Sequence, residues 1–109
     1  MPLRRRPELR DSNEVEIVTA LQQVGASVTR IGEPGVPDLL VGFRGETYLL
    51  EVKHVDAKGR TVRRWSGGRA PDERGLTRDQ QLWWNTWTGK PPVIVRTPDE
   101  ALRAIGATN

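Results

Sequence analysis

Apolar residues recur with two different periods along this chain. Between residues 15 and 24 they follow helical spacing, and Gly25 ends the run. Two later runs, 37–43 and 47–52, are rich in apolar and β-branched residues. Arg44-Gly45 lies between these runs, and a two-residue link containing glycine is typical of a β-hairpin. The pattern therefore predicts a helix followed by a hairpin.

Turn signals and further apolar runs complete the order of elements. The first helix is expected to open at the capping side chains of Asp11-Ser12-Asn13. Strands are expected at 27–31, 37–43, 47–52 and 93–96, and later helices at 77–88 and 98–105. The predicted fold is α/β in the order α-β-β-β-α-β-α, a mixed and bent sheet of about four strands flanked by helices.

A chain of 109 residues forms one small domain. We expect residues 1–10 to be a disordered basic arm and 11–109 to be a single domain. The stretch 54–75 is polar and contains five glycines or prolines, so it is predicted to be a loop inserted into that domain.

Composition excludes several kinds of site. There is no cysteine, so disulfides and thiolate zinc sites are excluded, and a single histidine excludes sites built from several histidines. A phosphate-binding loop motif is also missing. No signal peptide and no apolar run long enough to span a bilayer is found, so we expect a cytoplasmic protein that does not enter a membrane.

The positive charge of the chain is unevenly distributed. Residues 1–10 and 54–75 each carry a net charge of +3, and the remaining residues carry −3. Basic segments around an acidic core favour a polyanionic partner such as DNA, although solvated basic segments also occur for solubility alone. Within the loop, the candidate nucleic-acid contacts are Arg60, Arg63, Arg64, Trp65 and Arg69. Trp65 could stack on an unpaired base, or anchor the loop to the domain or to a second subunit.

The spacing of three charged residues predicts a site on the hairpin. With Arg44-Gly45 as its two-residue link, directly opposed residues sum to 89, so Asp38 faces Glu51 with their Cβ atoms about 5 Å apart. Lys53 lies two residues beyond Glu51 and points to the same face. A shift of one residue would separate the two acids and destroy the site. The alternative is a hairpin that carries only a surface salt bridge.

Two adjacent carboxylates repel each other, and a divalent cation offsets this repulsion. Oxygen ligands suit Mg²⁺, which needs few of them from the protein. Asp38, Glu51 and the carbonyl of Val52 are the predicted metal ligands. Such an ion can activate a water molecule and stabilise charge on a phosphate, while Lys53 orients the water, helps to deprotonate it or neutralises the transition state.

The segments Gly35-Val36-Pro37-Asp38 and Leu50-Glu51-Val52-Lys53 resemble the motifs of the PD-(D/E)xK nuclease superfamily. With Leu76-Thr77-Arg78-Asp79-Gln80 after them, the chain is most similar to the small virus-type replication-repair (VRR-NUC-like) nucleases. The resemblance covers about residues 11–105 and implies a restriction-endonuclease-like core. It implies hydrolysis of DNA phosphodiester bonds with Mg²⁺ or Mn²⁺, with Asp38 and Glu51 as metal ligands and Lys53 as a catalytic residue. Some nucleases of this branch are homodimers that cut branched DNA.

The resemblance implies two further catalytic residues. A glutamate on the first helix would contact water at the metal, and Glu16 fits best, with Glu14 as the alternative. Gln80 matches a glutamine expected near the metal or the scissile phosphate. Both also fit capping boxes, with Asn13 for Glu16 and with Thr77 for Gln80, so each could stabilise a helix start instead.

The tryptophans of the second helix recur along one face. Trp83, Trp84 and Trp87 are expected to pack mainly against the sheet as core, with base stacking as the sharper alternative. These three tryptophans also share a face with Gln80, which would direct Gln80 toward the sheet.

Three hypotheses of function follow. The first is a metal-dependent DNA endonuclease, in which specificity for branched DNA and pairing into a homodimer are both open. The second is a non-catalytic nucleic-acid-binding domain on a nuclease-like fold, motivated by the basic arm and loop. The third is a protein-interaction domain that uses the tryptophan-bearing helix. A complete set of Asp38, Glu51 and Lys53 favours the first, because a binding domain has no need to keep all three.

Overall fold

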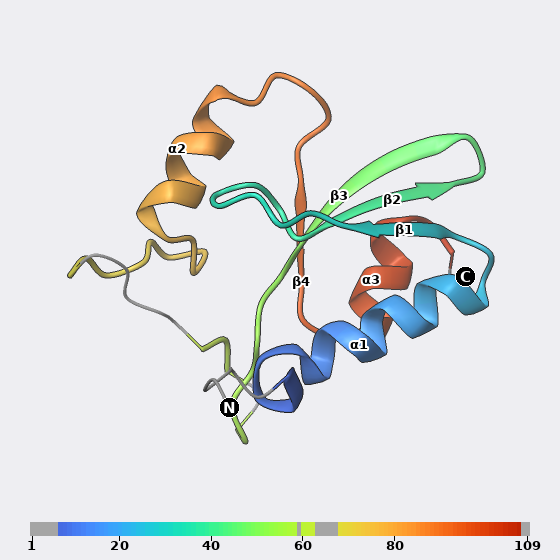
Figure 1. Cartoon of the computed structure of the whole chain (residues 1–109), viewed down its shortest axis with the longest axis horizontal. Helices are drawn as coiled ribbons and strands as arrows, with labels where there is room; N and C mark the ends of the chain where they lie inside the picture. The colour runs from blue at the N-terminus through green and yellow to red at the C-terminus, as the bar shows by residue number, and fades with distance from the viewer. Residues whose placement is uncertain (1–6, 59, 63–67, 108–109) are drawn as a thin grey trace, which may run out of the picture.

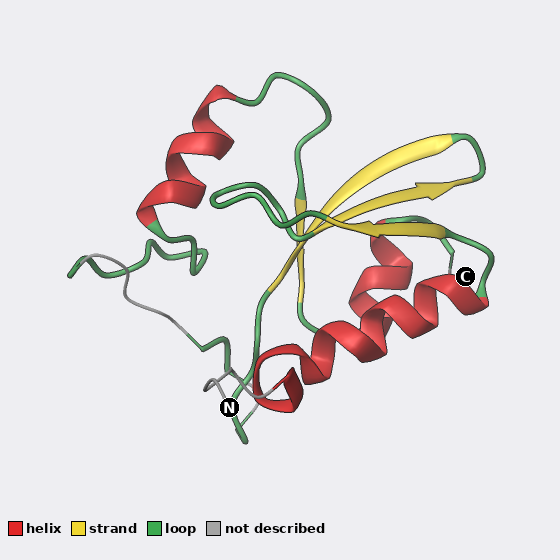
Figure 2. Cartoon of the chain, in the orientation of Figure 1, coloured by secondary structure: helices red, strands yellow, loops and turns green. Residues whose placement is uncertain are grey.

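The computed structural model describes residues 7–58, 60–62 and 68–107, with the backbone alone for 7–12. Three helices and a four-stranded sheet follow one another in the predicted order, as Figures 1 and 2 show. The elements are α1 (Pro7–Gln23), β1 (Ser27–Arg30), β2 (Leu39–Phe43), β3 (Glu46–Val52), α2 (Arg78–Thr86), β4 (Val93–Val95) and α3 (Pro98–Ala104). The predicted α/β class and element order are therefore confirmed. Within the described ranges, no helix has the length and apolar character needed to cross a bilayer.

The sheet is open and mixed, with the strand order β1-β2-β3-β4. β1, β2 and β3 pair antiparallel, and β4 joins β3 in parallel through the crossover that contains α2. Arg44 and Gly45 have φ angles of 53° and 80°, and positive φ at both positions produces the tight turn that matches strand twist. Leu39 consequently pairs with Leu50 and Phe43 with Glu46, which confirms the predicted register.

The core lies on one face of the sheet. Alternate residues of β2 and β3, such as Leu39, Val41 and Leu50, are buried there against α1 and α3. α1 and α3 lie side by side on this face and contact each other. Since strand side chains alternate, residues such as Leu40 and Glu51 point to the opposite face. The hairpin therefore presents its predicted acidic pair on the side of the sheet away from the core.

α1 begins earlier than its capping residues indicate. It starts at Pro7, so residues 7–10 are helical and are not part of a disordered arm, while residues 1–6 lie outside the described ranges. Proline is favoured at the first helical position because its missing N–H is unpaired there in any case. Asn13 is therefore inside the helix, so the predicted capping box with Glu16 is wrong.

α2 differs most from expectation. It has no buried residue, so the prediction that its tryptophans form core is wrong. The helix lies beyond the end of the sheet, away from α1 and α3 (Figure 1), and its first turn carries its closest contacts with β3. It ends at Thr86 because Trp87 is already extended, with φ −76° and ψ 127°.

The stretch 54–75 contains no helix or strand among its described residues, as predicted, but parts of it are ordered. Val55 and Thr61 form an isolated antiparallel bridge. Asp56 accepts hydrogen bonds from the N–H groups of Lys58 and Arg60 at 2.9 Å each. These contacts form a small turn at the start of the loop.

Candidate metal centre

The loop before β2 sets the position of Asp38. Gly35 has a φ of +83°, and a Cβ at this position would lie 2.9 Å from the carbonyl oxygen of Asp79, so only glycine fits against the start of α2. Pro37 is buried. The carbonyl of Asp38 accepts a hydrogen bond from the N–H of Ile31 at 2.8 Å, which continues the β1–β2 ladder by one step. The backbone at Asp38 is thus held from two sides.

Asp38 and Glu51 meet as the register requires. Their positions continue the β2–β3 pairing one step beyond Leu39 and Leu50, and their carboxyl groups are close enough for each to act on the pKa of the other. Asp38 Oδ2 also accepts a hydrogen bond from the N–H of Val52 at 2.8 Å. This bond holds the Asp38 carboxyl group against the backbone at the end of β3.

Glu51 is the buried charge of the site, with only 2% of the residue exposed. Its Oε2 atom accepts a hydrogen bond from Gln80 Nε2 at 2.7 Å and lies 3.4 Å from Lys53 Nζ. Its Oε1 atom is buried and has no hydrogen-bond partner. Buried carboxylate oxygens are nearly always paired, so this atom has a coordination position to offer.

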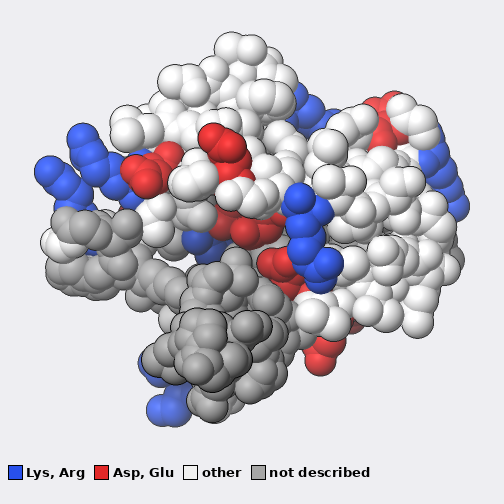
Figure 3. Space-filling view, in the orientation of Figure 1, with Lys and Arg blue, Asp and Glu red and all other residues white. Residues whose placement is uncertain are grey.

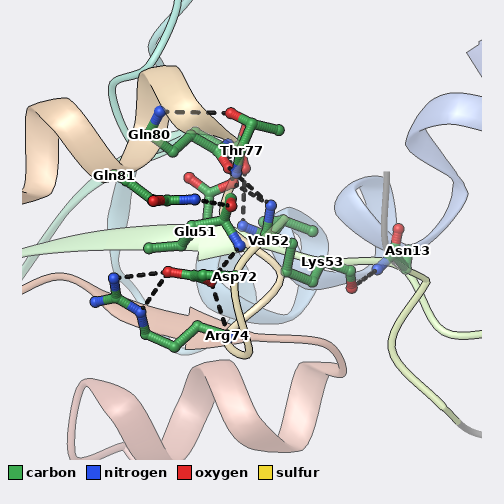
Figure 4. A network of polar contacts seen from close by, with 11 residues as sticks. Asn13, Glu51, Val52, Lys53, Asp72, Arg74, Thr77, Gln80 and Gln81 are labelled. Carbon is green, nitrogen blue, oxygen red and sulfur yellow. Dashed lines mark hydrogen bonds and ion pairs between the residues drawn. The ribbon is translucent and has the colours of Figure 1, made fainter. Parts of the chain in front are cut away.

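Gln80 forms the predicted capping box and also contacts the charged residues of the site. Its Oε1 atom accepts from the N–H of Thr77 at 2.9 Å, which forms the capping box of α2, and from Lys53 Nζ at 3.0 Å. Since Oε1 has two donors, the amide nitrogen must face the carboxylate of Glu51. One side chain therefore starts α2 and joins it to Glu51 and Lys53, as Figure 4 shows.

Lys53 lies just past the end of β3, where its backbone leaves the sheet. Its N–H donates to the carbonyl of Val95 at 3.0 Å. Its carbonyl accepts from Asn13 Nδ2 at 2.9 Å, and the same nitrogen lies 3.4 Å from the carbonyl of Arg96. Asn13 thus reaches from α1 across the ends of two parallel strands and holds the peptide that carries Lys53 (Figure 4). The sequence had suggested only a capping role for Asn13, and its helical phase, four residues before buried Ile17, is the one signal that places it toward the sheet.

The two glutamates of α1 differ in position. Glu16 is exposed and has no hydrogen bond or ion pair among the described contacts. Glu14 is close enough to Asp38 to raise its pKa, and its Oε2 atom pairs with Arg30 Nε at 2.8 Å. The structure therefore brings Glu14 to the site instead of Glu16. The signal lay in helical phase, because Glu14 is four residues before buried Val18.

Acidic side chains gather at the centre of the face seen in Figure 3, above the point where the strands converge, with basic side chains beside them. Burial and the neighbouring Asp38 raise the pKa of Glu51 to about 8, while the ammonium group of Lys53 acts in the opposite direction. Burial also raises the pKa of Asp38, and the hydrogen bond from Val52 partly offsets this. Without a further positive charge, the pair is therefore expected to retain a proton near neutral pH.

The residues present fit a hard divalent cation. Two carboxyl groups with raised pKa values and one buried, unpartnered oxygen form an anionic oxygen site, which Mg²⁺ and Mn²⁺ prefer. Within the described ranges, no set of three or more histidine, aspartate or glutamate side chains is arranged to hold a metal. An ion here would thus have two carboxylates, and the Val52 carbonyl stays a predicted third ligand.

The raised pKa values predict how stability depends on pH and Mg²⁺. Between pH 4.5 and about 8, the folded protein holds a proton on Glu51 that the unfolded chain releases, so the free energy of unfolding is expected to fall as pH rises. Mg²⁺ must compete with that proton for the Glu51 carboxylate only below about pH 8, where the proton is bound. Urea denaturation at about pH 6 and about pH 9 should show a larger Mg²⁺-induced stabilisation at the higher pH. Equal stabilisation at both pH values would contradict a metal on Glu51.

The predicted loop contacts are only partly described. Arg60 is exposed and its Nε atom pairs with Asp56 at 2.9 Å, and Arg69 is exposed. Arg63, Arg64 and Trp65 lie outside the described ranges. No described contact joins Arg60 or Arg69 to the acidic pair, so their part in nucleic-acid binding stays a prediction.

Comparison with known proteins adds no relative. A scan against models of known protein families, a search of curated proteins and a search of solved structures each find no match to this chain.

Proposed function

We propose that this protein is a metal-dependent endonuclease that hydrolyses phosphodiester bonds of DNA, with Mg²⁺ or Mn²⁺ as its ion. The observation that carries this proposal is the convergence of Asp38, Glu51, Lys53 and Gln80 at one point, where Glu51 Oε1 is buried without a partner. A surface salt bridge would not need this burial, since exposed ion pairs contribute little. The resemblance to PD-(D/E)xK nucleases rests on these same residues.

Each residue has a distinct part in the proposed chemistry. A bound Mg²⁺ would lower the pKa of a coordinated water molecule and offset negative charge on the phosphate. Asp38 and Glu51 would hold the ion. Lys53 is placed 3.4 Å from Glu51, where its ammonium group can orient the attacking water and neutralise charge that develops on the phosphate. Gln80 fixes the direction of both Glu51 and Lys53.

DNA is the proposed polyanion because of the charge of the chain. The sequence pI is about 9.9 although the site itself is acidic. Basic residues away from the acids can bind the phosphate backbone on either side of the scissile bond. We place this activity in the cytoplasm of a bacterium or of a phage-infected cell, and a homodimer is compatible with the small domain.

Cleavage of a panel of labelled DNAs tests the proposal. Linear, flapped, forked and four-way DNAs would be incubated with Mg²⁺, Mn²⁺ or EDTA. Cleavage in either metal and none in EDTA is expected. Salt-sensitive binding without cleavage in any metal would instead favour the non-catalytic nucleic-acid-binding domain.

Asn13→Ala is expected to lower kcat about tenfold or more with little change in KM. Loss of the Asn13–Lys53 hydrogen bond leaves the Lys53 backbone less firmly held, so the Lys53 ammonium group is positioned less accurately. In a chain that already carries Lys53→Ala, Asn13→Ala should cause almost no further loss. Single-turnover cleavage rates for the four proteins measure this coupling.

Thr61→Val is a matched control for Asn13→Ala. It removes a different long-range hydrogen bond, which Arg96 Nη1 donates to Thr61 Oγ1 at 3.1 Å. It should lower stability without reducing kcat. Additive losses for Asn13→Ala and Lys53→Ala would mean that Asn13 acts on the fold alone.

A further inference from the structure

α2 and the residue that follows it carry three tryptophans that the described chain covers only in part. We define the α2 aromatic strip as Trp83, Trp84 and Trp87. Trp83 and Trp84 are half-buried, with the Nε1 atom of Trp84 enclosed and without a hydrogen-bond partner, and 42% of Trp87 is exposed. Large aromatic side chains that stay partly accessible along one face of a small protein can mark a binding surface.

The strip is held in a fixed shape. The rings of Trp83 and Trp87 stack with centroids 4.8 Å apart and an angle of 18° between their planes. Trp87 Nε1 donates to the carbonyl of Lys90 at 2.9 Å. The backbone of Gly89 packs so closely on the Trp87 ring that a Cβ there would lie 2.7 Å from it. A flat aromatic surface that is already ordered loses little entropy when it binds a planar partner.

The strip continues the helix face that points into the proposed metal centre. Trp83, Trp84 and Trp87 follow Gln80 by three, four and seven residues, so they share its face. At 1.5 Å per residue they lie about 5–10 Å along the helix from Gln80. A stacked DNA strand advances about 3.4 Å per nucleotide, so this span corresponds to roughly one to three nucleotides.

The charges around the strip do not favour phosphate. Arg74, whose guanidinium lies 5.4 Å from the Trp84 ring centre, is paired with Asp72 at 2.8 Å. Lys90 is paired with Glu46 at 3.8 Å. What the strip offers is therefore a π surface, and the planar faces of DNA bases are accessible for stacking only where the bases are unpaired.

We propose that the α2 aromatic strip stacks unpaired bases of the DNA strand close to the scissile phosphate. The preferred substrate is then DNA with a single-stranded segment beside the cut, such as a flap, a fork or an overhang. This inference rests on the proposed function, since it takes DNA as the ligand of the neighbouring site. A second copy of the chain is the competing occupant, but exposed Leu82 lies about half a turn away from Gln80 and does not extend the strip into an aliphatic patch.

Binding in EDTA tests the inference without any cleavage. The intact chain and the variants Trp83→Leu and Trp87→Leu would be titrated with labelled oligo(dT) and with a blunt hairpin duplex. Each substitution is expected to weaken oligo(dT) binding about tenfold and duplex binding less than about twofold. The loss should be the same at low and high salt, because stacking releases no counterions.

Leu82→Ala is the matched control on the same helix, since Leu82 is 53% exposed outside the strip, and it should change neither affinity. Circular dichroism verifies that each variant is folded. If a leucine variant is unfolded, quenching of tryptophan fluorescence by oligo(dT) in the intact chain takes its place, and absence of quenching would overturn the proposal.

Three further results would overturn it: unchanged oligo(dT) affinity in folded variants, equal losses for oligo(dT) and duplex, or sedimentation of the intact chain as a dimer that the tryptophan substitutions dissociate. The last would assign the strip to a second copy. The two proposals fail separately. Oligo(dT) binding without metal-dependent cleavage contradicts the nuclease, whereas cleavage of every DNA with no preference for single-stranded segments contradicts only the aromatic strip.

Discussion

Glu51→Gln is expected to reduce Mg²⁺-dependent cleavage about a thousandfold or more, because an ion contributes several kcal/mol of transition-state stabilisation and each 1.36 kcal/mol is a factor of ten. The new amide has almost the same shape but lacks the charge that holds a divalent cation. Single-turnover cleavage of the best DNA in the panel measures the loss. Calorimetric titration with Mn²⁺ should show that the ion no longer binds.

The same substitution should stabilise the metal-free protein at high pH. Above about pH 8 the native chain keeps an ionised carboxylate at Glu51 that is 2% exposed and close to Asp38. A neutral amide removes this repulsion and can donate a hydrogen bond to Asp38, so the free energy of unfolding should rise by a few kcal/mol. Below about pH 4.5, where Glu51 is protonated in both states, the gain should vanish.

Glu46→Gln is the control for this experiment. Glu46 is at the opposite end of β3, and its side chain is 65% exposed. Its substitution should alter neither cleavage nor stability at high pH. If Glu51→Gln left cleavage intact, Glu51 would not be a metal ligand. If the substitution destabilised the metal-free chain at high pH, the ionised Glu51 carboxylate would not be lowering the stability of the native protein.

Lys53→Met is expected to reduce cleavage about 10²–10⁴-fold while Mn²⁺ binds as well as before or more tightly. Methionine preserves the apolar stem, which lies close to Gly75, but removes the ammonium group 3.4 Å from Glu51. Loss of a cation beside the metal cannot weaken the attraction of the two carboxylates for it. The substitution should thus lower kcat, which cleavage rates measure. It should not weaken metal binding, which calorimetric titration with Mn²⁺ measures.

Lys58→Met provides the comparison, because Lys58 is an exposed lysine of the 54–75 loop. It should lower DNA affinity slightly at low salt and leave kcat unchanged. Parallel losses of Mn²⁺ binding and cleavage in Lys53→Met would show that the lysine builds the site instead of taking part in the reaction.

The hairpin shows how far local pattern reaches. Arg44-Gly45 and the two apolar runs beside it were enough to predict the pairing of Leu39 with Leu50, and with it the meeting of Asp38 and Glu51. This succeeded because a two-residue turn leaves one register only, and strand side chains alternate with a period of two. Gln80 was also singled out in advance: its capping box is confirmed and it contacts Glu51 as well, while its part in catalysis stays a prediction.

The helices show where local pattern ends. Glu14 and Glu16 were both plausible from the sequence, and α1 was given the wrong first residue. The tryptophans of α2 have the spacing of a buried stripe, but no residue of that helix is buried. Helical periodicity describes which side chains share a face and says nothing about whether another element covers that face.

The order of the elements, the register of the hairpin and the face that carries Asp38, Glu51 and Lys53 all follow from the chain read residue by residue, because they depend on turns and alternation within a few positions. The approach of Glu14 to the site, the hydrogen bond from Asn13 to Lys53 and the partial exposure of the α2 aromatic strip do not. They depend on where a helix docks, that is, on contacts between residues 24 or more positions apart, such as Asn13 and Lys53 at a separation of 40. Packing over such distances is a property of the folded molecule as a whole.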